Sequence, residues 1–238
     1  MPLSFLHSSP FVASLFSWLH GTRIRYLGSG HRVECRNSIL RGTEVEILGS
    51  NCRLTVGPGA RLWGCSITLK GDGAELYIGA DCRLRRVRLS VEDRGTRLQI
   101  GAKTSITGAT LVAQEGRLLQ VGEDCMIAQH AELRNSDSHA IYDHDNVRLN
   151  PPLDVVVGHH VWIGLGAYVF KGARIGDGAV IGARALVAGE IPPACVAFGV
   201  PAVPRISPVR WERGRDAKGR PTPSTSRAPF RTPEAPVP

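Results

Sequence analysis

The residues best suited to chemistry gather in one polar stretch, residues 128–154, which reads AQHAELRNSDSHAIYDHDNVRLNPPLD. A neutral imidazole can take a proton from a hydroxyl near neutral pH, and a carboxylate beside it can fix its tautomer. The stretch therefore favours general-base chemistry, although each of these side chains also suits a solvated loop. Its candidates are three histidines and two nearby aspartates: His130, His139, His144, Asp137 and Asp143.

This polar stretch interrupts a regular repeat. Downstream of it, aliphatic residues recur every six positions, and a small or β-branched residue stands four positions after most of them. The aliphatic positions are Val157, Ile163, Val169, Ile175, Ile181 and Val187, and the small ones are Val161, Ala167, Ala173, Ala179 and Ala185. A period of six does not fit a helix face, which needs about 3.6 residues. It predicts short strands joined by tight turns, three to a triangular coil, with the aliphatic side chains stacked inside.

Upstream, the same signature returns at a longer spacing, in LTVGPGARL, LYIGADCRL, LQIGAKTSI and LQVGEDCMI. The extra residues between these segments are polar and turn-like, and we expect them to protrude as tight hairpins between coils. The fourth position after each key aliphatic should again pack inside a corner: Ala60, Cys82, Thr104 and Cys125. Because no cysteine pair has CxxC spacing, these thiols are predicted to be packing residues rather than metal ligands.

Three stretches, SDSHAIYD, VVVGHHVWIG and IPPACVAFGVPA, resemble the hexapeptide-repeat O-acetyltransferases, which include galactoside, maltose and many polysaccharide acetyltransferases. The resemblance covers most of residues 45–206 and is tightest over 136–205. It implies an all-β fold, a left-handed parallel β-helix solenoid with one inserted active-site loop. It also implies acetyl-CoA as co-substrate, no metal, and a homotrimer.

By this resemblance, His139 occupies the place of the family's catalytic histidine, in the loop before VWIG. As general base it would take the proton of an acceptor hydroxyl while that oxygen attacks the thioester directly, with no covalent enzyme intermediate. Asp137 or Asp143 would orient the imidazole. Ala140 stands where glycoside acetyltransferases usually have proline, and the SDSH-x-I-x-D form is similar to capsule and lipopolysaccharide enzymes. We therefore expect a surface-polysaccharide sugar as acceptor.

The resemblance also implies a coenzyme site along the coils. The ring of Trp162 would lie near the coenzyme and the acceptor, while the other residues would give backbone contacts, the adenosine end of the site, or the charge for the 3′-phosphate. Arg184 or Arg205 would supply that charge, since the family's usual lysine position is Gly189 here. The residues implied are Trp162, Leu165, Ala183, Arg184, Ala188, Gly189 and Arg205.

Two other functions use the same solenoid. A γ-class carbonic anhydrase needs three histidines around zinc. His139 and His144 have a suitable spacing, but the hexads around Ile100 offer no third histidine. A non-enzymatic scaffold would have no need for the VWIG and GVPA segments. His159 and His160 fall at turn positions, where either a solvated role or a substrate contact is open.

The ends of the chain differ from the repeat. Residues 207–238 hold seven basic and three acidic side chains within a formal charge of +8, and their Pro/Ser/Thr-rich composition predicts a disordered, solvated tail without a nucleic-acid partner. Residues 1–26 are expected to form an N-terminal cap or interfacial segment, with weak membrane-surface contact through 1–20. Residues 27–206 should form the β-helix. A cytoplasmic protein is the default expectation.

Overall fold

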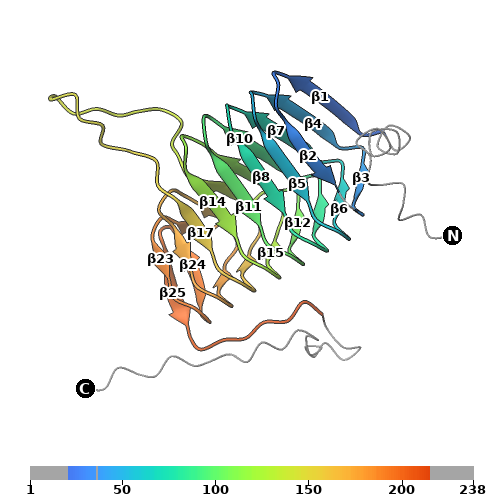
Figure 1. The fold of residues 1–238 in the computed structure, drawn as a ribbon. Coiled ribbons are helices and arrows are strands. Elements are labelled where there is room, and N and C mark those ends of the chain that lie inside the picture. Colours follow the sequence, from blue (N-terminus) through green and yellow to red (C-terminus); the bar gives the residue numbers. More distant parts are fainter. Residues whose placement is uncertain (1–20, 36, 215–238) are drawn as a thin grey trace, which may run out of the picture.

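The computed structural model describes residues 21–35 and 37–214, and these residues form strands, turns and loops without any helix. Three parallel sheets wrap around one core, as the repeat predicts (Figure 1). Sheet A contains β1 (Arg23–Leu27), β4 (Glu44–Leu48), β7 (Ser66–Lys70), β10 (Arg88–Glu92), β13 (Thr110–Ala113), β16 (Glu132–Arg134), β19 (Tyr168–Val169) and β22 (Leu186–Val187). Within the described residues, no helix has the length and apolar character needed to cross a bilayer.

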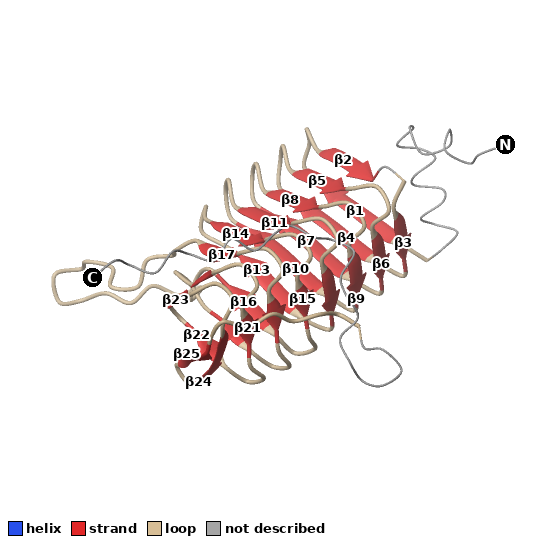
Figure 2. Ribbon diagram, turned by 90° about the horizontal axis from the view of Figure 1, so that it is seen from below, coloured by secondary structure: helices blue, strands red, loops and turns tan. Residues whose placement is uncertain are grey.

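The other two sheets complete each triangular coil (Figure 2). Sheet B contains β2 (Arg32–Cys35), β5 (Arg53–Val56), β8 (Glu75–Ile78), β11 (Arg97–Ile100), β14 (Leu118–Val121), β17 (Val155–Val157), β20 (Arg174–Ile175) and β23 (Glu190–Ile191). Sheet C contains β3 (Ile39–Arg41), β6 (Arg61–Trp63), β9 (Arg83–Arg85), β12 (Ser105–Thr107), β15 (Met126–Ile127), β18 (Trp162–Ile163), β21 (Val180–Ile181), β24 (Val196–Gly199) and β25 (Ala202–Ile206). The last pair, β24 and β25, is antiparallel. We name the corners AB, BC and CA after the sheets that they join.

The longer upstream repeats do not produce protruding hairpins, so that expectation is wrong. The extra residues instead lengthen the strands: β7 and β10 have five residues each, whereas β19 and β22 have two. Neighbouring coils carry the same additions, so β7 and β10 pair along their full length, with Ser66 opposite Arg88. Extended backbone that finds a ladder partner satisfies its hydrogen bonds better than a projecting turn would.

The core confirms the predicted inward positions. Ile78, Ile100 and Ile163 are fully buried, and burying each such side chain contributes about 1.5–3 kcal/mol. Cys82 and Cys125 fill corners and donate weak hydrogen bonds to carbonyl oxygens at 3.1 Å. Burial raises the pKa of Cys82 to about 11 and that of Cys125 to about 12. These thiols are therefore packing residues, as the repeat indicated.

The inserted loop and the solenoid begin at other residues than expected. Ile127 and Leu133 remain in register with Ile106 and Leu111, so the loop starts after β16 rather than at residue 128. It leaves corner AB and projects from the body of the solenoid as an arm, residues 135–154 (Figures 1 and 2). The first strand, β1, begins within the expected N-terminal cap, because it pairs with β4 from Arg23 onward.

Residues 207–214, which we call the strap, also depart from expectation. Their composition predicts a disordered tail, but they turn back after β25 and run toward β12 (Figure 1). The amide of Val209 donates to the carbonyl of Ala194 at corner BC, 2.8 Å away. Lys103, Asp124 and His160 turn the chain at this corner with φ values of 60°, 54° and 52°, and the strap bonds to each of them. Residues 215–238 and 1–20 lie outside the described residues.

Candidate functional site

The arm is tied to corner AB at its base. Its two ends meet where the amide of Leu153 donates to the carbonyl of Asn135. The Asn135 side chain accepts a hydrogen bond from the amide of Gln114 at 2.8 Å, one coil below. At the other end, the Asp154 carboxylate accepts from the amide of Leu118 at 3.0 Å. The base of the arm thus replaces the ladder contacts that the interrupted coil would otherwise make.

Two ion pairs strengthen this base. Arg148 donates two hydrogen bonds to Glu115, at 2.5 and 3.0 Å, and Ser136 donates a third. The Arg148 guanidinium, followed by the Ser136 hydroxyl, lowers the pKa of Glu115 below its usual range. Bidentate pairing of this kind fixes geometry as well as charge. The arm is therefore held in one orientation relative to corner AB.

Asp137 belongs to the second ion pair. Its carboxylate accepts hydrogen bonds from Lys171 at 2.5 Å and from the Asn150 side chain at 2.8 Å. The Lys171 ammonium, together with the Asn150 amide, lowers the pKa of Asp137. Asn150 also donates to the backbone carbonyl of His139 at 2.8 Å. Asp137 therefore positions the backbone beside His139 through Asn150.

The imidazole of His139 is left exposed by this arrangement. Among the described residues no side chain or backbone group forms a hydrogen bond with its ring. Asp143, the other predicted orienting residue, accepts from the amides of Asp145 and Val147 at 2.9 and 2.8 Å, which closes a turn at the tip of the arm. Within the described residues of one chain, both aspartates therefore stabilise the loop, and neither contacts the His139 ring, which is exposed.

The arm carries unusually apolar side chains for an exposed segment. Ile141, Tyr142, Val147 and Leu149 are 58%, 59%, 58% and 60% exposed. Contiguous exposed apolar surface of this kind marks an interaction site. The arm has the composition of a segment that packs on another surface.

The residues implied for the coenzyme lie along two edges of sheet A. Leu165, Ala183 and Arg184 are at corner CA, while Ala188 and Gly189 are at corner AB, the corner of the arm. All five are exposed on the solenoid surface. The Arg184 amide donates to the Leu165 carbonyl, and the Arg174 amide donates to the Gly189 carbonyl. The amides of Leu165 and Ala183 have no backbone partner among the described residues, so they can donate to a ligand's carbonyl groups.

Trp162 and Arg205 belong to a different face. Trp162 lies on β18 and Arg205 on β25, both in sheet C, and the Arg205 guanidinium lies 5.9 Å from the ring centre of Phe198. Corner AB is the one corner of the triangular coil that sheet C does not form. A single chain therefore does not bring His139 and Trp162 together.

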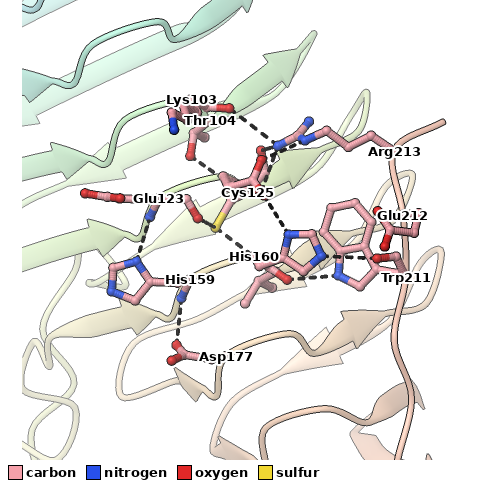
Figure 3. Close-up of polar contacts among 12 residues, drawn as sticks. Lys103, Thr104, Glu123, Cys125, His159, His160, Asp177, Trp211, Glu212 and Arg213 are labelled. Carbon is pink, nitrogen blue, oxygen red and sulfur yellow. Dashed lines mark hydrogen bonds and ion pairs between the residues drawn. The ribbon is translucent and has the colours of Figure 1, made fainter. Parts of the chain in front are cut away.

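A second cluster, which the sequence patterns did not predict, joins the strap to corner BC (Figure 3). His160 stacks on Trp211 with ring centres 4.1 Å apart and planes 10° apart. Its Nδ1 lies 2.8 Å from the Asp124 carboxylate and its Nε2 lies 3.1 Å from the carbonyl of Trp211. The indole N–H of Trp211 donates to the carbonyl of His160 at 2.9 Å. Trp211 is 7% exposed and also lies 5.9 Å from the ring of Trp162.

Arg213 completes this cluster. Its guanidinium donates to the carbonyl of Cys125 at 2.7 Å (Figure 3). It also donates to the Asp124 carboxylate at 2.9 Å and to the hydroxyl of Ser105 at 2.6 Å. The neighbouring His159 accepts a hydrogen bond from the amide of Glu123 at 3.2 Å, so its ring also joins two coils at corner BC. The one sequence signal for the cluster was a tryptophan in an otherwise polar tail. No group of three or more histidine, cysteine or acidic side chains suited to a metal ion occurs in the described part of the chain.

Comparison with known proteins supports the fold. No model of a known protein family matches the sequence. The polysialic acid O-acetyltransferase of Neisseria meningitidis is 32% identical over 136 residues, 57% of this chain and 63% of the relative. The corresponding protein of Escherichia coli O1:K1 / APEC is 32% identical over 101 residues, 42% of this chain and 33% of the relative. The matched segments thus span less than two thirds of these relatives.

The solved structures match over more of their length. The polysialic acid O-acetyltransferase OatWY superimposes with a TM-score of 0.79 and 28% identity, covering 82% of this chain and 93% of that one. The polySia-specific acetyltransferase NeuO gives a TM-score of 0.75 and 28% identity, covering 83% and 92%. The chain thus resembles polysialic acid O-acetyltransferases in both sequence and fold. The galactoside O-acetyltransferase of Escherichia coli K12 is a further relative, 36% identical over 84 residues (34% of this chain and 40% of the relative).

Proposed function

We propose that this acetyltransferase moves an acetyl group from acetyl-CoA to a sugar hydroxyl of a surface polysaccharide, with His139 as general base. The observation that carries the proposal is the exposed His139 imidazole on an arm whose base is fixed by two ion pairs. The similarity to the polysialic acid O-acetyltransferases supports the sugar acceptor. All six cysteines are free, which agrees with a reducing, cytoplasmic location.

In this proposal His139 carries one proton from the acceptor hydroxyl to the departing thiolate, in two steps. Its neutral ring accepts the proton of the attacking hydroxyl while that oxygen bonds to the thioester carbonyl carbon. The resulting imidazolium then returns the proton to the departing thiolate, so no covalent enzyme intermediate is required. The hydrogen bond from Asn150 to the His139 carbonyl holds the backbone beside the imidazole. Positioning of this kind lowers the entropic part of the barrier.

The site is completed, in this proposal, by a second copy of the chain within a homotrimer. The arm carries exposed apolar residues and His139 at corner AB, whereas Trp162 lies on sheet C. If the arm of one copy packs near sheet C of the next, the histidine and the tryptophan meet across the interface, and three copies close the ring. Leu165, Ala183, Ala188 and Gly189 would contact acetyl-CoA, with Arg184 or Arg205 at its 3′-phosphate.

The first test replaces His139. We expect His139→Ala to lower turnover by about 10²–10⁴ while acetyl-CoA still binds, because only the proton transfer is lost. His144→Ala is the matched control, since His144 is on the same arm and its side chain is 90% exposed. Near wild-type turnover in His139→Ala, with loss in His130→Ala or His160→Ala, would overturn the assignment. Full activity in all four variants would exclude the histidine mechanism.

The second test asks whether two copies share the site. His139→Ala and Trp162→Ala are each expected to be weakly active alone. Co-expressed in equal amounts, they should recover about a quarter of wild-type activity, because one interface in four then joins an intact histidine to an intact tryptophan. Light scattering should show a trimer. Absence of recovery in mixed trimers, or an active monomer, contradicts a shared site.

A further inference from the structure

The outer face of sheet C near its start carries five arginines around one tryptophan. We call this the arginine face: Arg41 on β3, Arg61 and Trp63 on β6, Arg83 and Arg85 on β9, and Arg86 in the turn that follows. All five arginines are exposed, and Trp63 is half-buried. The Arg85 guanidinium lies 5.2 Å from the centre of the Trp63 ring. No residue proposed above for the chemistry belongs to this face.

Some arginines of the other two sheets lie beside a neighbouring carboxylate. In sheet A, Arg25 lies opposite Glu46 and contacts it at 2.9 Å. In sheet B, Arg53 lies opposite Glu75 and contacts it at 3.6 Å. Sheet B also sets Arg32 opposite Arg53, but Arg32 has Glu34 at 2.5 Å. These pairs show how a carboxylate on the same sheet can offset the charge of an arginine.

The arginine face lacks such compensation. Arg61 lies directly opposite Arg83, and both Arg41 and Arg85 lie opposite Trp63. None of the five arginines forms an ion pair with a carboxylate of the described residues, although Glu44 and Asp81 are near in sequence. Like charges opposite each other on a sheet are destabilising. Because this repulsion destabilises the sheet, the arrangement indicates that an external anion supplies the compensating negative charge.

The face leads directly to the proposed site. One row of outward positions runs across adjacent strands of sheet C from Arg61 through Arg83, Ser105 and Met126 to Trp162. Strands lie about 4.8 Å apart, so Trp162 is about 14 Å from Arg83. The strap adds Arg213 in the middle of this row, on the hydroxyl of Ser105. An extended chain with one unit at Trp162 would therefore reach the arginines with its next units.

We propose that the arginine face binds the acceptor itself, as an extended anionic polysaccharide with an acidic group on successive sugar units. This inference rests on the proposed function. Guanidinium groups bind carboxylates in a planar, bidentate manner, and several such contacts along one polymer add up through their high effective concentration. A polymer is therefore held far more tightly than a single sugar. Nucleic acid suits the face less well, because Trp63 already lies against Arg85 and is not free to stack on bases.

The test uses the full chain and direct binding of polysialic acid, with dextran as the neutral polymer. Arg61→Glu/Arg83→Glu should weaken polysialic acid binding by about tenfold or more, and binding to the wild type should fall as salt rises. Arg94→Glu is the control, a single charge reversal at an exposed arginine outside the face. The double variant should raise KM for polysialic acid while turnover with a short sialic acid acceptor stays unchanged, because neither arginine belongs to the proposed catalytic set.

Four outcomes contradict the proposal. The first is unchanged polysialic acid binding in the double variant, and the second is equal binding of dextran. The third and fourth are a charge-dependent preference for single-stranded DNA, or for vesicles of anionic phospholipid, over polysialic acid. Binding is measured without acetyl-CoA, so it tests the face even if no acetyl transfer occurs. Transfer to the short acceptor tests the proposed activity separately.

Discussion

Trp211 anchors the strap, and its replacement should release residues 207–214 from the solenoid. Its indole ring is 7% exposed, stacks on His160 at 4.1 Å and donates a 2.9 Å hydrogen bond. Stacking contributes about 0.5–1.5 kcal/mol and the hydrogen bond a similar amount. With loss of burial included, Trp→Ala typically costs about 3–5 kcal/mol. Undocking in turn regains about 1–2 kcal/mol of backbone entropy per residue.

The free energy of docking the strap is a small difference between the contact energy gained and the backbone entropy lost, so losing the anchor should shift the equilibrium strongly. A change of about 3 kcal/mol corresponds to roughly two orders of magnitude in the population of the released state. Global unfolding should change less, because the coils keep their own core. Trypsin should therefore cut after Arg210 and Arg213 much faster in Trp211→Ala than in the wild type. Hydrogen exchange at the Val209 amide, bonded to Ala194, should accelerate in parallel.

Two variants test how much of the docking depends on ring stacking and how much on the polar contacts of the His160 ring. His160→Phe keeps an aromatic partner for the indole but removes the ring contacts with Asp124 and the Trp211 carbonyl, so cleavage should be intermediate. Tyr77→Ala removes an aromatic ring that is 48% exposed on sheet B, and it should leave cleavage unchanged. Equal cleavage rates at Arg213 in Trp211→Ala and the wild type would refute the reasoning.

Three further predictions concern the tail, the buried thiols and the arm. Deleting residues 215–238, rather than 213–238, should leave turnover within about threefold, as their composition suggests a solvated tail; a hundredfold loss would place part of the site there. Cys82 and Cys125, with pKa values raised to about 11 and 12, should react with thiol reagents only on unfolding, and rapid native labelling would contradict their packing role. The lowered pKa values of Asp137 and Glu115 mean that their contribution to the stability of the arm is complete above about pH 5 and lost as pH falls through the lower folded values; proteolysis of the arm should rise in that acidic window, and a flat profile would argue against the ion pairs.

The repeating part of the chain was predictable because its signal is local. Each inward residue, such as Ile163 or Ile181, packs on its equivalent one coil away. A constant period therefore predicts both the fold and the residues of the core. The buried thiols Cys82 and Cys125 followed from the same register. The loop containing His139 stood out because it interrupts that register.

The repeat period could not predict which residues of neighbouring coils pair with one another. The extra residues near Ser66 and Arg88 resembled turns, yet they form strands because the next coil offers equally long partners. Likewise Asp137 looked suited to orient His139, but Lys171, 34 residues away, takes its carboxylate. Pairings of this kind depend on which side chains the closed coils bring to one corner.

The sequence by itself determined the solenoid, its core and the loop that bears His139, because stacking equivalent residues requires only a constant period. Only the tertiary structure decided where the strap lies and which faces the candidate residues share. Trp211 and Arg213 reach partners 51 and 108 residues away, and no local pattern encodes so distant a contact. The placement of His139 and Trp162 on separate parts of the coil is likewise a property of the closed triangle, since only closure assigns each strand to a side.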